Sequence, residues 1–310
     1  LSAGERFDEW HRLKTGEAMI AVGARSAIFA PLKNIGVIII DEEHDGSYFS
    51  ESNPRYDTQE VAEFRRAYND CALVLGSATP SLKTYYNASK GKINLIEIKN
   101  RINNRPLPQV DIVDMAAEVR AGNKELFSRQ LKEELQKTVE EGHQAILFLN
   151  RRGYSSFVMC SKCGYVAKCP NCDVSLTYHR DEDVLKCHYC GKMFRLFKTC
   201  PACKSAFIRQ GRVGDQQVVE YIRSFLPDVK VLRMDADTTQ GKDSHRKILE
   251  AFGRGEASVL VGTQMIAKGH DFPRVTLVGI LEGDQSLYYS DYMAAEKTFQ
   301  LLPQVAGRSG

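Results

Sequence analysis

Runs of branched apolar residues alternate with amphipathic stretches along most of the chain. Residues 37–40, Val-Ile-Ile-Ile, form a continuous β-branched run, which is typical of a strand buried on both faces of a parallel sheet. The same patterning predicts further strands at residues 71–75, 145–149, 229–234, 258–261 and 275–281, and helices at residues 57–68, 124–141, 216–225 and 244–252. Strands that alternate with helices predict an α/β protein built on parallel sheets.

The length of 310 residues favours two lobes, each able to bury its own core. We expect residues 1–106 to belong to a first lobe, residues 107–122 to connect the lobes, and residues 123–310 to form a second lobe. A cysteine-rich module at residues 158–206 interrupts the second lobe. The chain has no initiating Met and stops in mid-pattern at Gly310, so we expect it to be a fragment of a longer protein.

Composition excludes several classes of protein. Hydrophobic residues make up 43% and charged residues 26%, which argues against disorder and coiled coils. No apolar run approaches the roughly 18 residues of a membrane helix, and no secretory signal opens the chain. We therefore expect a non-secreted protein without a membrane partner.

Charge is unevenly distributed, although the net charge is only +3. Residues 151–212 carry 12 Lys plus Arg against 4 Asp plus Glu, a formal charge of +8. A basic segment of this kind can face a polyanion such as nucleic acid.

Eight of the nine cysteines lie in this basic segment and form four Cys-x-x-Cys pairs. The pairs are Cys160/Cys163, Cys169/Cys172, Cys187/Cys190 and Cys200/Cys203. A Cys-x-x-Cys turn offers two sulfurs to one face of a metal, and two such turns complete a tetrahedral zinc site. The alternative is a disulfide framework, which is rare inside cells.

Three pairings of the four turns are possible, and spacing favours a nested one. Fourteen residues separate Cys172 from Cys187, enough for a ribbon hairpin, whereas five separate Cys163 from Cys169. We therefore predict two structural zinc ions, one held by the outer cysteines and one by the inner: Cys160, Cys163, Cys200 and Cys203 for the first, and Cys169, Cys172, Cys187 and Cys190 for the second. His179 and His188 lie in the same module and are alternative ligands.

A polar cluster, Asp41-Glu42-Glu43-His44, follows the first predicted strand directly. The ends of parallel strands are where open α/β sheets place their ligand sites. A carboxylate at such a position can hold Mg²⁺, and its neighbour can accept a proton from an attacking water. This assigns Asp41 to the metal and Glu42 to the general base. Read alone, the cluster is more typical of a solvated acidic loop.

Further motifs follow in order and change that balance. The series consists of residues 41–44 (Asp-Glu-Glu-His), 76–81 (Gly-Ser-Ala-Thr-Pro-Ser), 150–154 (Asn-Arg-Arg-Gly-Tyr), 262–273 (Gly-Thr-Gln-Met-Ile-Ala-Lys-Gly-His-Asp-Phe-Pro) and 304–310 (Gln-Val-Ala-Gly-Arg-Ser-Gly). This series resembles the motor motifs of superfamily-two helicases. With four Cys-x-x-Cys pairs in the second lobe, it is similar specifically to the PriA family of replication-restart helicases.

The resemblance implies two RecA-like lobes, the first incomplete here, that bind ATP with Mg²⁺ between them and translocate on single-stranded DNA at stalled forks. Its implied partners are single-stranded and forked DNA, single-strand-binding protein and the primosome or helicase-loading proteins, in the bacterial cytoplasm. Carried onto matching positions, it assigns catalysis to Asp41, Glu42, His44 and Arg308, nucleotide contacts to Gly269 and Asp271, and DNA contact or coupling to Ser77, Thr79, Arg151, Thr263, Tyr48, Phe49 and Tyr56.

One motor part is absent from these 310 residues, namely the phosphate-binding loop Gly-x-x-x-x-Gly-Lys-Ser/Thr. Gly241-Lys242 is followed by Asp243, and Ala236 stands where the first glycine is required. In the family this loop lies upstream of the matching region. Two hypotheses follow: an ATP-dependent DNA helicase represented by part of its core, or a non-enzymatic zinc protein that binds nucleic acid or a partner on a decayed motor fold.

Residues 1–310 alone should bind ATP weakly and hydrolyse it hardly at all. A phosphate-loop lysine and its backbone amides normally hold the β- and γ-phosphates, and Asp41 repels them unless Mg²⁺ intervenes. Steady-state phosphate release with and without single-stranded DNA tests this. Robust DNA-stimulated turnover by this segment would refute it.

Overall fold

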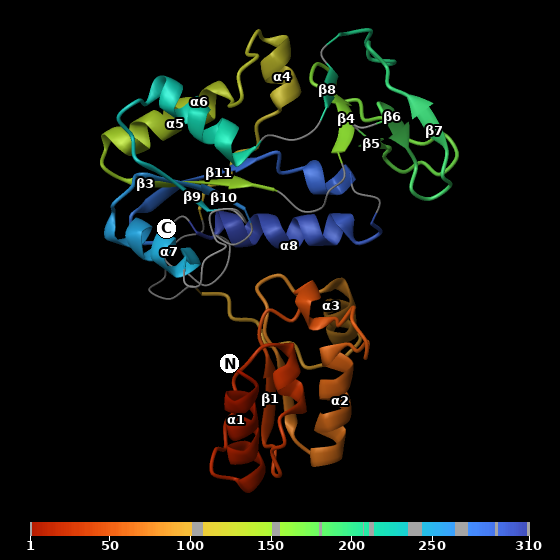
Figure 1. Cartoon of the computed structure of the whole chain (residues 1–310), viewed down its shortest axis with the longest axis vertical. Helices are drawn as coiled ribbons and strands as arrows, with labels where there is room; N and C mark the ends of the chain where they lie inside the picture. The colour runs from red at the N-terminus through yellow and green to blue at the C-terminus, as the bar shows by residue number, and fades with distance from the viewer. Residues whose placement is uncertain are drawn as a thin grey trace. The chain divides into compact units, whose positions relative to one another are not determined.

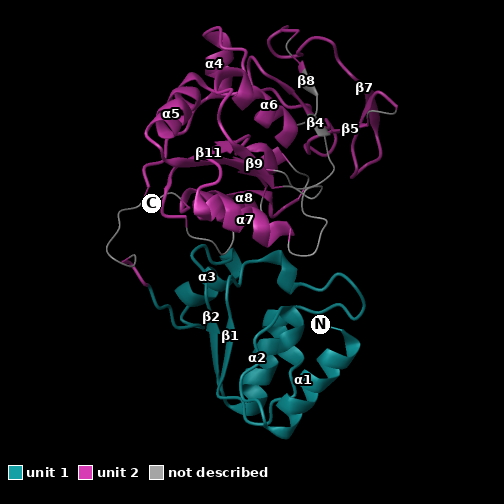
Figure 2. Ribbon diagram, turned by 60° about the vertical axis from the view of Figure 1, so that its left-hand side comes forward, with its two compact units in different colours: residues 1–97 teal, residues 98–310 magenta. Residues whose placement is uncertain are grey.

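The computed structural model describes residues 2–100, 108–150, 156–179, 182–206, 208–210, 214–234, 244–263, 272–288 and 291–308. The chain divides into two compact units, residues 1–97 and residues 98–310 (Figure 2). Each unit is described here by itself.

Unit 1 contains a short parallel sheet with helices around it. Its elements are α1 (Ala3–Thr15), η1 (Arg25–Phe29), β1 (Val37–Ile40), η2 (Gly46–Tyr48), α2 (Thr58–Asn69), β2 (Ala72–Leu75) and α3 (Leu82–Ser89). Capping explains where α2 begins, because the Asp57 carboxylate accepts a hydrogen bond from the N–H of Gln59. The predicted strands at 37–40 and 71–75 and the helix at 57–68 are all present, with bounds shifted by one residue at most.

The two strands of unit 1 are not buried as the sequence predicts. β1 pairs with β2 in parallel, with Val37 opposite Ala72 and Ile40 opposite Leu75. Ile40 lies in a core with Ile28 and Ala62, but Val37 is 50% exposed and Ile39 is 66% exposed. The prediction that both faces are buried is therefore wrong for unit 1, because its core forms on the face of β1 that meets α2.

Unit 2 combines a larger parallel sheet with a cysteine-rich module. Its elements are α4 (Met115–Arg120), α5 (Arg129–Glu140), β3 (Gln144–Leu149), β4 (Ser156–Cys160), β5 (Thr177–His179), β6 (Val184–Lys186), β7 (Met193–Arg195), β8 (Ile208–Gln210), α6 (Asp215–Phe225), β9 (Val231–Met234), α7 (Ser244–Arg254), β10 (Val259–Gly262), β11 (Val275–Leu281), η5 (Gln285–Tyr288) and α8 (Ala294–Ala306).

The main sheet has the order β11-β3-β10-β9, and every neighbouring pair is parallel. Helices α5 and α6 lie on one face of this sheet, and α7 and α8 lie on the other (Figure 1). All six residues of β3 are buried, as expected for a central strand covered on both faces. The predicted α/β fold with parallel sheets and a cysteine-rich insertion is confirmed.

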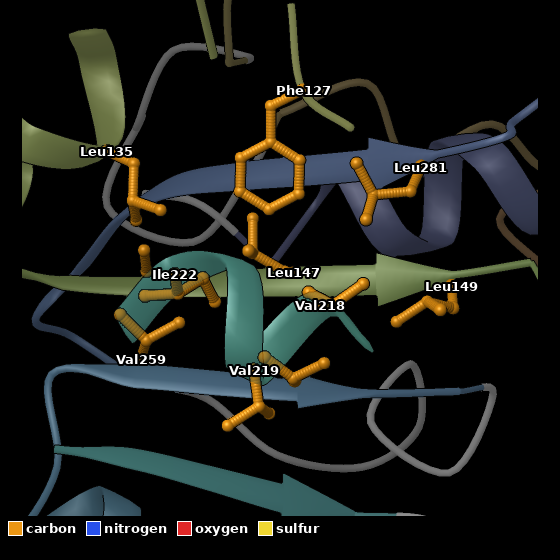
Figure 3. Close-up of a cluster of buried hydrophobic side chains, with 11 residues drawn as sticks. Phe127, Leu135, Leu147, Leu149, Val218, Val219, Ile222, Val259 and Leu281 are labelled. Carbon is orange, nitrogen blue, oxygen red and sulfur yellow. The ribbon is translucent and has the colours of Figure 1, made fainter. Parts of the chain in front are cut away.

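Alternate residues of β3 belong to different cores. Ala145, Leu147 and Leu149 pack with side chains of α5 and α6 in the cluster of Figure 3. Ile146 packs with residues of α7, and Phe148 packs with Val305 of α8. The two-residue period of a strand therefore distributes one apolar run between two helical layers.

One predicted helix begins later than its sequence pattern suggests. The helix expected at residues 124–141 starts at Arg129, because the Ser128 side chain caps it by accepting from the N–H of Leu131. Asn123 instead stabilises the turn before the helix, because its Oδ1 accepts the N–H of Glu125. Phe127, which is 1% exposed, fills the core just before the cap.

The cysteine-rich module is a small antiparallel sheet with the order β7-β6-β5-β4-β8. It enters the chain after β3 and leaves it before α6, so it is an insertion into the α/β lobe. Arg120 of α4 binds the module by donating to the carbonyl of Lys162 at 3.1 Å. It also donates to Asp114, the capping residue of α4, at 3.3 Å. Among the described helices, no stretch is both long enough and apolar enough to cross a bilayer.

Gly279→Ala should destabilise unit 2 by about 1–3 kcal/mol, the usual cost of overpacking a core. A Cβ at this position of β11 would lie 2.6 Å from Leu147 Cδ2 and 2.8 Å from Leu131 Cδ1. Urea unfolding followed by circular dichroism measures the change.

Gly253→Ala is the matched control in the same unit. Its added Cβ would make ordinary contact with Phe272 at 3.8 Å, and alanine favours the α7 helix. The control should be neutral or stabilising. A Gly279→Ala protein as stable as this control would show that α5 and β11 do not need the glycine to pack.

Candidate functional site

The structure gathers eight sulfur atoms into two groups. In each group the four ligand atoms lie within 4.8 Å of one another, and the groups are Cys160, Cys163, Cys200 and Cys203, and Cys169, Cys172, Cys187 and Cys190. These are the nested sets that the spacing of the pairs predicts. All nine cysteines are free, so the structure contains no disulfide framework.

The sulfur positions fit a tetrahedral zinc ion. The Sγ atoms of Cys160 and Cys203 are 3.6 Å apart, and those of Cys163 and Cys200 are 3.7 Å apart. A tetrahedron with Zn–S bonds of about 2.3 Å has edges of about 3.8 Å, in agreement with these separations. Four thiolates close the coordination shell and leave no position for a reactive water, so each site is suited to a structural ion.

The four Cys-x-x-Cys turns share one backbone geometry. In each turn, the residue after the second cysteine has a positive φ and donates its N–H to the carbonyl of the first cysteine at 2.9 Å. These residues are Gly164, Asp173, Gly191 and Lys204. The turn directs both sulfurs toward the same point, which is why this spacing recurs at metal sites.

The surroundings shift the pKa values of two inner thiols in opposite directions. Backbone N–H groups, first that of Cys190, lower the pKa of Cys187 to about 7. Burial, together with the neighbouring sulfurs of Cys190 and Cys187, raises the pKa of Cys172 to about 12. Neighbouring thiolates disfavour each other's ionised form, so a cation between the four sulfurs would stabilise the group.

His179 and His188 lie outside both sulfur groups. Their Nε2 atoms are 3.3 Å apart, so the two rings contact each other, and neither histidine is a member of a metal-ligating group among the described residues. The alternative in which these histidines replace a cysteine ligand is therefore not supported by the geometry.

In unit 1 the acidic residues form a turn at the end of β1. Asp41 is exposed and Glu42 is half-buried, with a φ of 49° at Glu42. The Asp41 carboxylate accepts the Glu42 N–H at 3.0 Å, and Glu42 Oε2 lies 3.5 Å from His44 Nδ1. The turn thus presents two adjacent carboxylates at the carboxyl edge of the small sheet.

A hydrogen-bond network joins this turn to the polar segment after β2. His44 Nδ1 lies 2.7 Å from Ser77 Oγ, and Ser77 Oγ accepts the N–H of Thr79 at 3.0 Å. The parallel pairing of β1 and β2 extends this far, because the Gly76 N–H donates to the Ile40 carbonyl at 2.8 Å. Residues 33 apart in the chain are therefore in direct contact.

The three aromatic residues assigned to DNA contact or coupling, Tyr48, Phe49 and Tyr56, occupy different environments. The Tyr48 hydroxyl donates to the Asp41 carbonyl at 2.7 Å, and burial, then the charges of Asp41 and Glu42, raise the pKa of Tyr48. Tyr56 packs edge-on against Phe29 at 5.0 Å. Phe49 is 50% exposed. Among these three, Phe49 offers the most ring surface for stacking, while Tyr48 remains protonated and anchors the loop to the acidic turn.

The remaining predicted residues belong to unit 2 or lie outside the described residues. The residues outside the described part of the chain are Arg151, Gly269 and Asp271. Thr263 directly follows β10 and Arg308 follows α8, both half-buried.

Two polar residues belong to the quoted motifs, but sequence reasoning gave them no role. Glu43 is buried and accepts three hydrogen bonds from Ser81 and Thr84. Asn150, at the end of β3, is 2% exposed, and its Oδ1 has no hydrogen-bond partner within the described part of the chain. The sequence signal for both residues was their place just after a predicted parallel strand.

Comparisons with known proteins agree with the motifs. Residues 169–192 match the PriA DNA helicase Cys-rich region (CRR) domain, and residues 206–310 match the Helicase conserved C-terminal domain. The chain is 54% identical over 310 residues to replication restart protein PriA of Bacillus subtilis (strain 168), covering 100% of this chain and 38% of that protein. The resemblance to PriA is confirmed.

More distant relatives extend the match. The Synechocystis PriA is 45% identical over 319 residues, and the Thermotoga maritima PriA is 35% identical over 310 residues. Each alignment covers 100% of this chain, but only 38% and 41% of those relatives. The chain therefore spans about two fifths of the length of these PriA proteins, and both cysteine groups and the acidic turn lie in that part.

Metal analysis should find two zinc equivalents per chain, because two complete tetrathiolate sites are present. Cys187→Ser should reduce this to about one equivalent and unfold the ribbon of β5, β6 and β7, since metal binding supplies most of the folding free energy of such small modules. Inductively coupled plasma mass spectrometry and amide protection measure the two effects.

Cys71→Ser is the control, because Cys71 lies in unit 1 and in neither sulfur group. It should retain both metal equivalents. One equivalent in the unaltered chain, or two in Cys187→Ser, would contradict the two-site assignment.

Proposed function

We propose that this chain is part of the motor of an ATP-dependent DNA helicase of the PriA type, which acts at stalled or collapsed replication forks. The contact between His44 and Ser77 carries the proposal, since it connects the acidic turn to the Ser77–Thr79 segment at 2.7 Å. A solvated acidic loop needs no such connection. A motor needs it, because nucleotide hydrolysis and DNA movement must be coupled through discrete contacts.

The acidic turn supplies the groups for phosphoryl transfer. Glu42 would accept a proton from the attacking water, and His44, 3.5 Å away, would orient that carboxylate. Asp41 would hold Mg²⁺, which neutralises charge on the phosphates when it is bound with ATP. From unit 2, Arg308 would stabilise charge at the transferring phosphate, and Gly269 and Asp271 would contact the nucleotide.

Single-stranded DNA is the proposed track. The exposed ring of Phe49 can stack on a base, and the adjacent Tyr48 connects that loop to the Asp41 backbone. Arg151 and Thr263 would contact the DNA backbone, the Ser77–Thr79 segment would couple the nucleotide state to DNA, and Tyr56 would support the aromatic loop. The basic segment at residues 151–212, formally +8, provides a further polyanion surface.

The wider assembly is inferred from the PriA relatives. We infer a location in the bacterial cytoplasm, since the relatives from Bacillus subtilis and Synechocystis are named replication restart proteins. Single-strand-binding protein and primosome or helicase-loading proteins would be its partners at the fork. The two zinc sites would hold the cysteine-rich module rigid as a contact surface.

Two isosteric substitutions in the full-length protein test the acidic turn. Glu42→Gln removes the base but keeps the shape, so ATP turnover should fall about 10²–10⁴-fold while nucleotide and DNA binding survive. Asp41→Asn should also weaken Mg²⁺-dependent nucleotide binding. DNA-stimulated phosphate release and fluorescent-nucleotide titration measure the two phenotypes.

Glu63→Gln on α2 is the matched control, since it removes an exposed carboxylate of the same unit. It should leave both measurements unchanged. Normal DNA-stimulated hydrolysis by Glu42→Gln would defeat the motor assignment and favour a zinc-dependent scaffold on a decayed helicase fold.

A further inference from the structure

Glu43 is the buried carboxylate of the acidic turn, with 9% of the residue exposed. It lies between Glu42 and His44 in sequence, but its carboxylate is bonded to Ser81 and Thr84. A buried carboxylate is costly unless hydrogen bonds satisfy it. Its partners therefore indicate what it does.

The Glu43 side chain is bonded to the start of α3. Oε1 accepts the N–H of Ser81 at 2.6 Å. Oε2 accepts the hydroxyls of Ser81 at 3.2 Å and Thr84 at 3.0 Å. A carboxylate is well placed there, because the first N–H groups of a helix lack partners within the helix.

The Glu43 main chain is bonded to the end of β2. Its N–H donates to the carbonyl of Gly76 at 3.0 Å. One residue of the acidic turn therefore holds both ends of the loop that runs from Gly76 to Ser81. That loop contains Ser77 and Thr79.

The enclosed loop also carries a buried group that its own fold does not satisfy. Thr79 is 5% exposed, and its Oγ1 has no hydrogen-bond partner within the described part of the chain. The Ser77 hydroxyl, in contrast, already has two hydrogen-bond partners, His44 Nδ1 and the Thr79 N–H. Because Glu43 is bonded to both ends of the loop, a displacement of the loop can reach the acidic turn.

We propose that Glu43 is a positioning residue that clasps the loop at residues 76–81 to the acidic turn, so that DNA contact at this loop shifts Asp41 and Glu42. The inference rests on the proposed function, because it concerns how the same motor is stimulated by DNA. It assigns to Glu43 no contact with nucleotide, metal or DNA.

Three variants of the full-length protein separate a clasp from a general structural role. Glu43→Ala removes all three side-chain hydrogen bonds. Glu43→Gln keeps an oxygen for the Ser81 N–H, and its amide can donate to the Ser81 and Thr84 hydroxyls. Glu118→Ala is the matched control in unit 2, where Glu118 accepts the Arg129 N–H at 3.0 Å at the start of α5.

The decisive measurement is the ratio of ATPase rates with and without single-stranded DNA. Glu43→Ala should keep the DNA-free rate and lose about 10- to 100-fold of the stimulated rate, as expected when supporting contacts of a site are removed. Glu43→Gln should restore most of the ratio, and Glu118→Ala should leave it unchanged. An unchanged ratio in Glu43→Ala, an equal fall of both rates, or no restoration by Glu43→Gln would overturn the proposal.

Amide hydrogen exchange tests the clasp independently of catalysis. In Glu43→Ala the amides of Ser81 and Thr84 should lose protection, together with those of the acidic turn. If the unaltered protein shows no DNA-stimulated hydrolysis, the proposed function fails, and the exchange result still decides the clasp. Unchanged protection at both places would overturn it.

Discussion

The parallel pairing of β1 with β2 is the constraint on which the motor residues depend. Two parallel strands end at the same edge of a sheet, and here the pairing continues from Leu75 into the bond between the Gly76 N–H and the Ile40 carbonyl. The chain that leaves each strand must therefore turn at the same place. His44 and Ser77 contact each other because of this backbone arrangement, and Glu43 then strengthens it from the side chain.

In unit 2, too, neighbouring parallel strands end at the same edge of a sheet, but different residues follow them. β3 and β10 are parallel neighbours, so Asn150 and Thr263 follow strands that end at the same edge of the larger sheet. The cysteine-rich module is inserted after β3, directly beyond this edge. An insertion there leaves the sheet register intact, because it lengthens a connection and does not interrupt a strand.

The module and the lobe are stabilised by different means. The lobe has two large apolar clusters on opposite faces of one sheet, whereas the module has strands of three to five residues and a core that includes the cysteines Cys169 and Cys187. So small an apolar core is marginal by itself, and an ion bound by each group of four thiolates would supply the rest of the stability. Arg120 adds a direct connection between α4 and one cysteine turn.

The sequence by itself determined the strands of the two parallel sheets, several of the helices beside them, the cysteine sets and the location of the acidic turn, whereas α1, α3, α4 and α8 appeared only in the structure. These depend on local patterns: β-branched runs, capping residues such as Asp57, and the spacing of thiol pairs. Tertiary structure decided the exposure of Val37 and Ile39, because burial depends on which face is covered rather than on the strand's own composition. It also decided the later start of α5 at Arg129, where the Ser128 cap and the burial of Phe127 overrode helical periodicity. Only the fold could reveal Glu43 as a clasp, since its partners lie 38 and 41 residues away and are brought to it by the parallel pairing of two strands.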